Sequence, residues 1–242
     1  MANKTDSKTL DTLVENLRAA HGDNLASIVL YGSVAAGDHV AEHSDHNLLI
    51  ALNRIALEDL RLSQNALRDW LKSGQPPPVY FTVEELSRAA DVFPIEFLQM
   101  EKARKILYGR DPFEFVEISQ ANLRRQTEYE LRTKLIQLRR LYIPASTSVE
   151  KLCALMSDSL ASFAALFRAV LILHVQESPV SKADSIRATA RLLGLNESPF
   201  EQILRLRSKS GKPLTVAEAN SVFSDYLSQI ERVIEAVDRI ER

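Results

Sequence analysis

The sequence predicts an α+β domain over residues 1–115, followed by an all-α helical bundle over residues 116–242. Short apolar runs typical of buried strands occur in the first half, whereas helical spacing of apolar residues dominates from about Glu117 to the end. A length of 242 residues is enough for two small domains. Prolines, which are tolerated at helix starts, fall in the breaks of the second half, at positions 144, 179, 199 and 213.

Each element is assigned from the spacing of its apolar residues. A recurrence every three or four residues indicates a helix, and a continuous run rich in β-branched residues indicates a buried strand. The predicted helices of the first half cover residues 9–20, 56–72 and 83–90, and the predicted strands cover residues 25–31, 45–52, 79–82, 94–100 and 105–108. The predicted helices of the second half cover residues 120–142, 148–175, 182–193, 197–208 and 214–241.

Composition narrows the class of protein and its location. Lys and Arg (30) nearly balance Asp and Glu (32), so no global basic field draws the chain to nucleic acid. The one cysteine, Cys153, lies among apolar residues, and a single thiol excludes an internal disulfide. Residues 1–8 are polar and predict no signal peptide. Polar groups within residues 152–175 favour a bundle helix over a membrane span. We therefore expect a cytoplasmic protein without a membrane partner.

The stretch from Ile28 to Leu52 contains the residues that indicate phosphate and metal binding. The first strand ends in Gly32 and Ser33, and the second begins at Asp45. A glycine at a strand end permits a tight turn and close approach to a phosphate, and a hydroxyl with free backbone N–H groups can hold a triphosphate. Residues 45 and 47 share one side of their strand. Carboxylates there, with a third from a neighbouring strand, can hold two Mg²⁺ ions for phosphoryl-type transfer.

These residues resemble the signature of the polymerase-beta-type nucleotidyltransferases, the group that includes the aminoglycoside nucleotidyltransferases. Gly32 and Ser33 match, and eleven residues separate Ser33 from Asp45. Residues 93–97 and 106–112 resemble the strand with the third carboxylate and the turn after it, which assigns Glu96 to the third acidic position. Asp91 lies close by and is an alternative. The resemblance implies a small mixed sheet flanked by helices, a helical partner domain, a nucleoside triphosphate ligand and Mg²⁺.

Position 47 departs from the family, because Asn47 stands where its members have Asp or Glu. An amide oxygen can ligate a metal but carries no negative charge, and Mg²⁺ is held mainly by carboxylates and phosphate oxygens. Asp45, Asn47 and Glu96 would therefore form a degenerate metal site. The first hypothesis is a nucleotide-binding or regulatory protein with weak or no catalysis.

Two alternatives stay open. One is an active Mg²⁺-dependent nucleotidyltransferase that moves a nucleoside monophosphate from the triphosphate to the hydroxyl of a small molecule. The other is a non-catalytic interaction module, in which the bundle forms a homodimer or binds another protein. The apolar helices at residues 148–175 and 214–241 would supply that interface.

Other polar groups have structural interpretations. His39, His43 and His46 could bind a transition metal, but a solvated loop with one strand histidine is the better interpretation. Arg168 and His174 are six residues apart on one predicted helix and do not align. Arg125, Arg132 and Arg139 share a helix face that could meet an anion, although Glu128 and Glu130 among them favour a salt-bridged surface.

Overall fold

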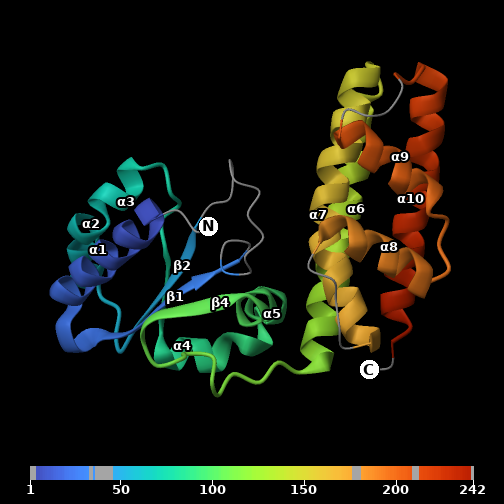
Figure 1. The fold of residues 1–242 in the computed structure, drawn as a ribbon. Coiled ribbons are helices and arrows are strands. Elements are labelled where there is room, and N and C mark those ends of the chain that lie inside the picture. The colour runs from blue at the N-terminus through green and yellow to red at the C-terminus, as the bar shows by residue number, and fades with distance from the viewer. Residues whose placement is uncertain (1–3, 33–34, 36–45, 176–180, 209–212, 241–242) are drawn as a thin grey trace. The chain divides into compact units, whose positions relative to one another are not determined.

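The computed structural model describes residues 4–32, 35, 46–175, 181–208 and 213–240 (Figure 1). The chain divides into two units, Met1–Ser119 and Gln120–Arg242. The first holds a sheet with helices on both faces, and the second holds helices. The predicted fold class, α+β followed by an all-α bundle, is confirmed.

The sheet of the first unit has four strands in the order β3-β2-β1-β4. The strands are β1 (Leu25–Tyr31), β2 (Asn47–Leu52), β3 (Val79–Thr82) and β4 (Arg104–Gly109). β1 is antiparallel to both β2 and β4, whereas β2 and β3 are parallel, so the sheet is mixed. The parallel pair needs a crossover, which α2 (Leu57–Ala66) and α3 (Arg68–Lys72) supply.

Successive strand residues point to opposite faces of the sheet, and the apolar ones pack into two separate cores, one on each face. On one face, Ile28 and Ile50 pack with Leu17 and Trp70, from α1 (Lys4–His21) and α3. On the other, Val29 and Leu49 pack with Leu86 and Phe97. This second face is covered by α4 (Val83–Arg88), η2 (Ala89–Asp91) and α5 (Pro94–Lys102). Figure 1 shows the two groups of helices on opposite sides of the strands.

The predicted strand at residues 94–100 is wrong, because this segment is the helix α5. Alternating apolar residues at Phe93, Ile95 and Phe97 imitate a strand. However, the buried positions include Phe97 and Met100, whose spacing of three fits one face of a helix. Pro94 opens the helix, where its fixed φ and missing N–H are both tolerated. The helix predicted over residues 56–72 is likewise divided, at Leu67, into α2 and α3.

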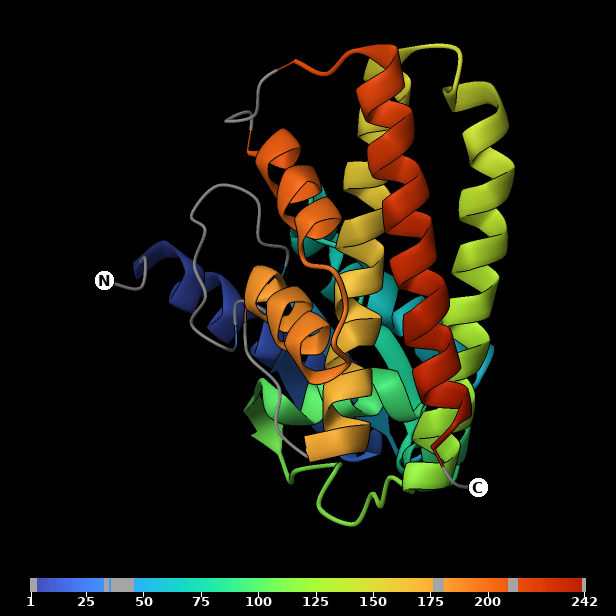
Figure 2. The same ribbon diagram turned by 90° about the vertical axis from the view of Figure 1, so that its right-hand side faces the viewer.

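The second unit is built around one helix. The elements are α6 (Gln120–Ala145), α7 (Val149–Val175), α8 (Lys182–Leu192), α9 (Ser198–Arg207) and α10 (Val216–Asp238). α7 contacts all four of the others. Figure 2 shows α6, α7 and α10 running side by side, with the shorter α8 and α9 against them. Phe163, Phe167, Phe200 and Tyr226 meet at edge-on or tilted angles in the core.

The central position of α7 explains its apolar composition. Val149–His174 is long and apolar enough to cross a membrane by length and composition alone. Half of its most apolar window is buried inside the protein, and Phe163 and Phe167 contact aromatic side chains of other bundle helices. Its Arg168 donates from Nε to Ser185 Oγ at 3.4 Å. These contacts are those of a bundle core helix.

Candidate functional site

Gly32 forms the turn at the end of β1. Its φ is +88°, a conformation that favours glycine, and its N–H donates to the Ala103 carbonyl at 2.9 Å. A Cβ added to Gly32 would lie 3.1 Å from Asn47 Nδ2. The side-chain amide of Asn47 therefore packs directly against the glycine turn, with little room for any side chain between them.

Three neighbouring strands align a row of polar groups beside this turn. Asn47 begins β2 and lies opposite Tyr31 of β1, which lies opposite Arg104 of β4. Directly paired residues have side chains on the same face of a sheet, and this is the face of Val29 and Leu49. Burial raises the pKa of the Tyr31 phenol, so this side chain stays neutral and can donate or accept a hydrogen bond.

Arg104 is engaged in fixing the end of the sheet. Its Nε and Nη2 donate to one carboxylate oxygen of Asp111, at 3.1 and 2.6 Å. Its Nη1 donates to the Glu101 carbonyl at 2.6 Å, and its guanidinium lies 5.0–6.0 Å-range distance from the Phe113 ring, at 5.6 Å to the centroid. The other oxygen of Asp111 accepts the N–H of Phe113 at 3.0 Å. This arginine thus ties β4 to the segment after it.

His46 belongs to the opposite face of the sheet. Its backbone N–H donates to Gln75 Oε1 at 2.9 Å, and its ring meets Trp70 edge-on, with 6.0 Å between the ring centroids. The ring is therefore turned away from Asn47, as the alternation along a strand requires. His39 and His43, the other members of the considered histidine cluster, lie outside the described residues.

The remaining members of the predicted site are either exposed or outside the described residues. Ser33 and Asp45 lie outside the described residues. Glu96 is exposed on α5, the helix that covers the Asn47 face, and Asp91 is exposed at the end of η2. In the described ranges, no three His, Cys, Asp or Glu side chains come together as a metal site. Because Asn47 is neutral, these residues offer one negative charge fewer than a set of three carboxylates, the ligands that Mg²⁺ prefers.

A wide hollow of the first unit, about 1040 Å³, lies along β3, α4 and η2. Its carboxylates are engaged in local contacts. Glu84 pairs with Arg88 at 2.8 Å, and Glu85 accepts the N–H of Thr82 at 2.7 Å as part of a helix cap. Neither Gly32 nor Asn47 lines this hollow, so it is separate from the glycine turn.

The other polar candidates have structural roles. His174 Nδ1 lies 2.9 Å from the Val170 carbonyl of its own helix. Burial raises the pKa of the half-buried Cys153 thiol, which opposes thiolate formation. On α6, Arg132 pairs with Glu128 at 2.9 Å, and Arg139 pairs with Glu231 of α10 at 2.6 Å. These two arginines form part of a salt-bridged surface.

Sequence reasoning missed Tyr31 and Arg104. Their place beside Asn47 depends on the pairing of β1 with β4, two strands that are far apart in the sequence. The available signal was the end of each predicted strand, because Tyr31 is the last residue of one and Arg104 immediately precedes the other.

Comparison with known proteins supplies a structural neighbour. No family model matches the chain, and no curated protein matches it in sequence. Among solved structures, the chain is similar to spectinomycin adenyltransferase AAD(9) from Enterococcus faecialis, determined with ATP and spectinomycin. The TM-score is 0.58 at 14% identity, over 94% of this chain and 98% of the other. The likeness shows a nucleotidyltransferase fold that extends over both units.

Proposed function

We propose that this chain binds a nucleoside triphosphate at the Gly32 turn and has weak or no nucleotidyl transfer activity. The observation that carries the proposal is the contact between Asn47 and Gly32. An added Cβ at Gly32 would lie 3.1 Å from Asn47 Nδ2, so a neutral amide occupies the place beside the turn where the resembling family has a carboxylate. The similar fold of an adenyltransferase whose structure was determined with ATP supports nucleotide binding by this fold.

The proposed contacts follow from the donors at the turn. Ser33 would hold the triphosphate through its hydroxyl and backbone N–H. Gly32, whose own N–H donates to the Ala103 carbonyl, would let the phosphate approach the backbone closely. Asn47 Nδ2 can donate to a phosphate oxygen, which a carboxylate cannot do. The amide would therefore add a direct hydrogen bond to the ligand, while its oxygen stays available to a metal.

Mg²⁺ would be held by Asp45, with Asn47 and Glu96 as further ligands in the proposed site. When bound, the metal neutralises phosphate charge and favours transfer. Exchanging a carboxylate for an amide removes one negative charge from the ligand set, which weakens metal binding and raises the barrier to transfer. Asp45 then carries most of the affinity for the metal. A cytoplasmic location would place the protein where nucleoside triphosphates occur.

An active transferase is the second candidate, favoured by a fold match that covers 94% of this chain with a protein called an adenyltransferase. A hydroxyl of a small molecule would attack the α-phosphorus, the bond from that phosphorus to pyrophosphate would break, and the hydroxyl proton would pass to a carboxylate. Asp45 and Glu96 are the carboxylates proposed for this role.

Calorimetric titration of ATP and GTP, with and without Mg²⁺, tests the proposal. The native protein should bind nucleotide, and Asp45→Ala should abolish the dependence on Mg²⁺. Asn47→Asp should tighten Mg²⁺-dependent binding about tenfold, as one added metal contact of about 1.4 kcal/mol would. Asn65→Asp makes the same chemical change on the exposed surface of α2, beside Arg68, and should leave both affinities unchanged.

Two outcomes would overturn the proposal. Absence of nucleotide binding in both the native protein and Asn47→Asp would leave the fold as a scaffold only. Turnover by the native protein with a hydroxyl acceptor, lost in Asp45→Ala, would establish the active transferase instead.

A further inference from the structure

The helical unit contains a groove between α6 and α7. Its volume is about 210 Å³, and every residue that lines it belongs to one of these two helices. None of the residues assigned to the nucleotide site is among them. An apolar protein cavity of about 150 Å³ can hold benzene, so this groove has room for a small organic molecule.

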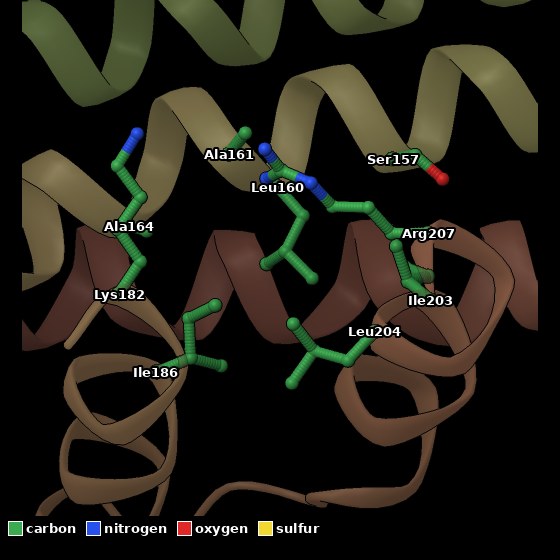
Figure 3. A pocket seen from close by; sticks show the side chains of 9 residues that line it. All are labelled: Ser157, Leu160, Ala161, Ala164, Lys182, Ile186, Ile203, Leu204 and Arg207. Atoms are coloured by element: carbon green, nitrogen blue, oxygen red, sulfur yellow. The ribbon is translucent and has the colours of Figure 1, made fainter. Parts of the chain in front are cut away.

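A second hollow of the same unit is excluded by its size. It lies among α7, α8 and α9, where side chains such as Leu160, Ile186 and Ile203 nearly fill the space (Figure 3). The room that remains is about 20 Å³, which is enough for about one water molecule. The groove between α6 and α7 is therefore the better candidate for a ligand.

The groove has an apolar lining that is only partly covered. Leu138 and Phe163 are 2% and 1% exposed, whereas Leu141 is 38% exposed. Leu155, the fourth apolar residue, also keeps some exposure. Apolar surface that is removed from water contributes favourably to binding. The lining therefore favours a ligand with an apolar group.

Two opposite charges line the same groove. Lys134 belongs to α6, and Asp158 belongs to α7. In the described part of the chain, neither forms a salt bridge with the other or with a third residue, whereas Arg132 of α6 pairs with Glu128 at 2.9 Å. Opposite charges that do not pair with each other can each attract one end of a ligand that lies between them. A molecule that carries both charges would match this arrangement.

The other polar groups indicate which way such a ligand points. The Ser159 hydroxyl, in the half-buried part of the groove, is already engaged by the Met156 carbonyl at 3.0 Å and by the Tyr226 hydroxyl at 3.2 Å. Gln137 and Asp158, by contrast, are exposed. Polar ends of a ligand therefore find partners at the open side of the groove, and an apolar group faces its buried side.

We propose that this groove binds a zwitterionic amino acid with an aliphatic side chain. The ammonium of the ligand pairs with Asp158, its carboxylate pairs with Lys134, and its side chain covers Leu138 and Phe163. Charge-assisted hydrogen bonds at both ends fix the orientation of the ligand. This binding goes beyond the proposed nucleotide site and does not depend on it.

Chemical-shift titration of the full chain, without nucleotide, tests the chemistry with four probes. L-leucine carries both charges and the side chain, 4-methylpentanoate lacks the ammonium, 3-methylbutylamine lacks the carboxylate, and glycine lacks the side chain. Leucine should bind with a Kd of about 1 mM and about tenfold more tightly than each of the other probes, because each of those lacks one contact. Absence of leucine binding, or equal binding of any of the other probes, would overturn the proposal.

Two variants assign the charges. Asp158→Asn should weaken the binding of leucine and 3-methylbutylamine about tenfold, as the loss of a charge-assisted hydrogen bond predicts, and should leave 4-methylpentanoate unchanged. Lys134→Gln should weaken leucine and 4-methylpentanoate and leave 3-methylbutylamine unchanged. The opposite pattern, or equal weakening of every probe, would contradict the pairing of the two ends.

Further variants locate the binding. Ser162→Leu fills the groove without changing its charge and should reduce the affinity for leucine. Asp225→Asn and Lys72→Gln remove the same charges from exposed positions that do not line the groove, and both should keep the native affinity. An equal loss in these two controls would show a non-specific charge effect and exclude the groove as the binding site. Urea denaturation of each variant separates a loss of binding from a loss of folding.

Discussion

The two faces of the sheet differ in how deeply their polar side chains are buried. On the α1–α2 face, His21 and Ser63 are 7% and 3% exposed, and His21 Nε2 lies 3.0 Å from Ser63 Oγ. Asp59, 7% exposed, accepts from Asn24 Nδ2 at 2.9 Å and from the N–H of Ala56 at 2.8 Å. These buried groups form a network that connects α1, the 3-10 helix η1 (Gly22–Asn24) and α2, and we call this side of the sheet the closed face.

On the other face, the polar groups beside the glycine turn are only partly buried. Asn47 and Tyr31 both keep some exposure, and the Asn47 amide contacts the backbone of the turn. A ligand can reach such groups without unfolding the sheet. This face is therefore where the polar groups are available for binding.

The contrast shows why a short distance alone does not identify catalysis. His21 and Ser63 have the separation of a base and its nucleophile, yet the Ser63 hydroxyl donates to the Asp59 carbonyl one turn earlier at 3.0 Å and is buried. The pair stabilises the fold. We therefore expect substitutions on the closed face to change stability, and those at the glycine turn to change nucleotide binding.

Substitutions in the two cores should lower the free energy of unfolding most, and by similar amounts on both faces of the sheet. Trp70 is 3% exposed on the closed face, and Phe97 is 1% exposed on the other. Either residue changed to Ala should lower the free energy of unfolding by about 3–5 kcal/mol, because a large buried ring is lost and a cavity remains. Urea denaturation measures both. A loss below about 1 kcal/mol at either site would show that its face is not a packed core.

Asp59→Ala should have the next largest effect. It leaves the Ala56 N–H and the Asn24 amide without their acceptor, which should cost about 1–3 kcal/mol of unfolding free energy. Nucleotide affinity should not change. Asp69→Ala, an exposed carboxylate on α3, is the control and should be nearly neutral. A selective loss of nucleotide binding at full stability in Asp59→Ala would reverse the roles assigned to the two faces.

Features that depend on local sequence periodicity could be predicted, whereas contacts between residues far apart in the sequence could not. Strand alternation alone predicts that residues 45 and 47 lie side by side and that His46 faces away, because this depends only on local periodicity. The contact between His21 and Ser63 spans 42 residues and follows from packing that no local pattern contains. The pairing of Tyr31 with Arg104 depends on β1 meeting β4, which is equally non-local.

The main error in the fold had a local cause. Residues 93, 95 and 97 are apolar with the period of a strand, whereas Pro94 is the first residue of the helix α5. Most strands and helices were predicted because their apolar spacing was unambiguous. Ser33, Asp45 and the role of Glu96 stay predictions, since they rest on a family resemblance.

Gly32→Ala should have a smaller effect on stability and a selective one on binding. The positive φ of +88° makes any side chain strained, at a cost of about 1–2 kcal/mol, and the new methyl would press on the Asn47 amide. Gly74→Ala is the matched control, with φ +83° but nothing within 4 Å of an added Cβ. Both should lose similar stability, and only Gly32→Ala should weaken ATP binding by calorimetry. Equal effects on ATP would exclude the turn as the binding site.

The smallest effect should be a pH dependence that arises on the closed face. Burial lowers the pKa of His21, and the nearby charge of Asp59 opposes that shift only in part. The neutral ring lies beside Ser63 and has its centroid 6.5 Å from that of Tyr80. The unfolded chain therefore takes up this proton at a higher pH than the folded protein does.

The sign of the effect follows from that order of protonation. The stability contributed by neutral His21 is fully present above the unfolded pKa of about 6.5. It is lost as the pH falls from there toward the lower folded pKa. Urea denaturation at pH 8 and pH 5.5 should show a smaller difference in His21→Gln than in the native protein. His174→Gln, an exposed histidine of α7, should keep the native difference. If His21→Gln kept it too, protonation of the closed network would not contribute to acid sensitivity, and the network would be held by its neutral hydrogen bonds alone.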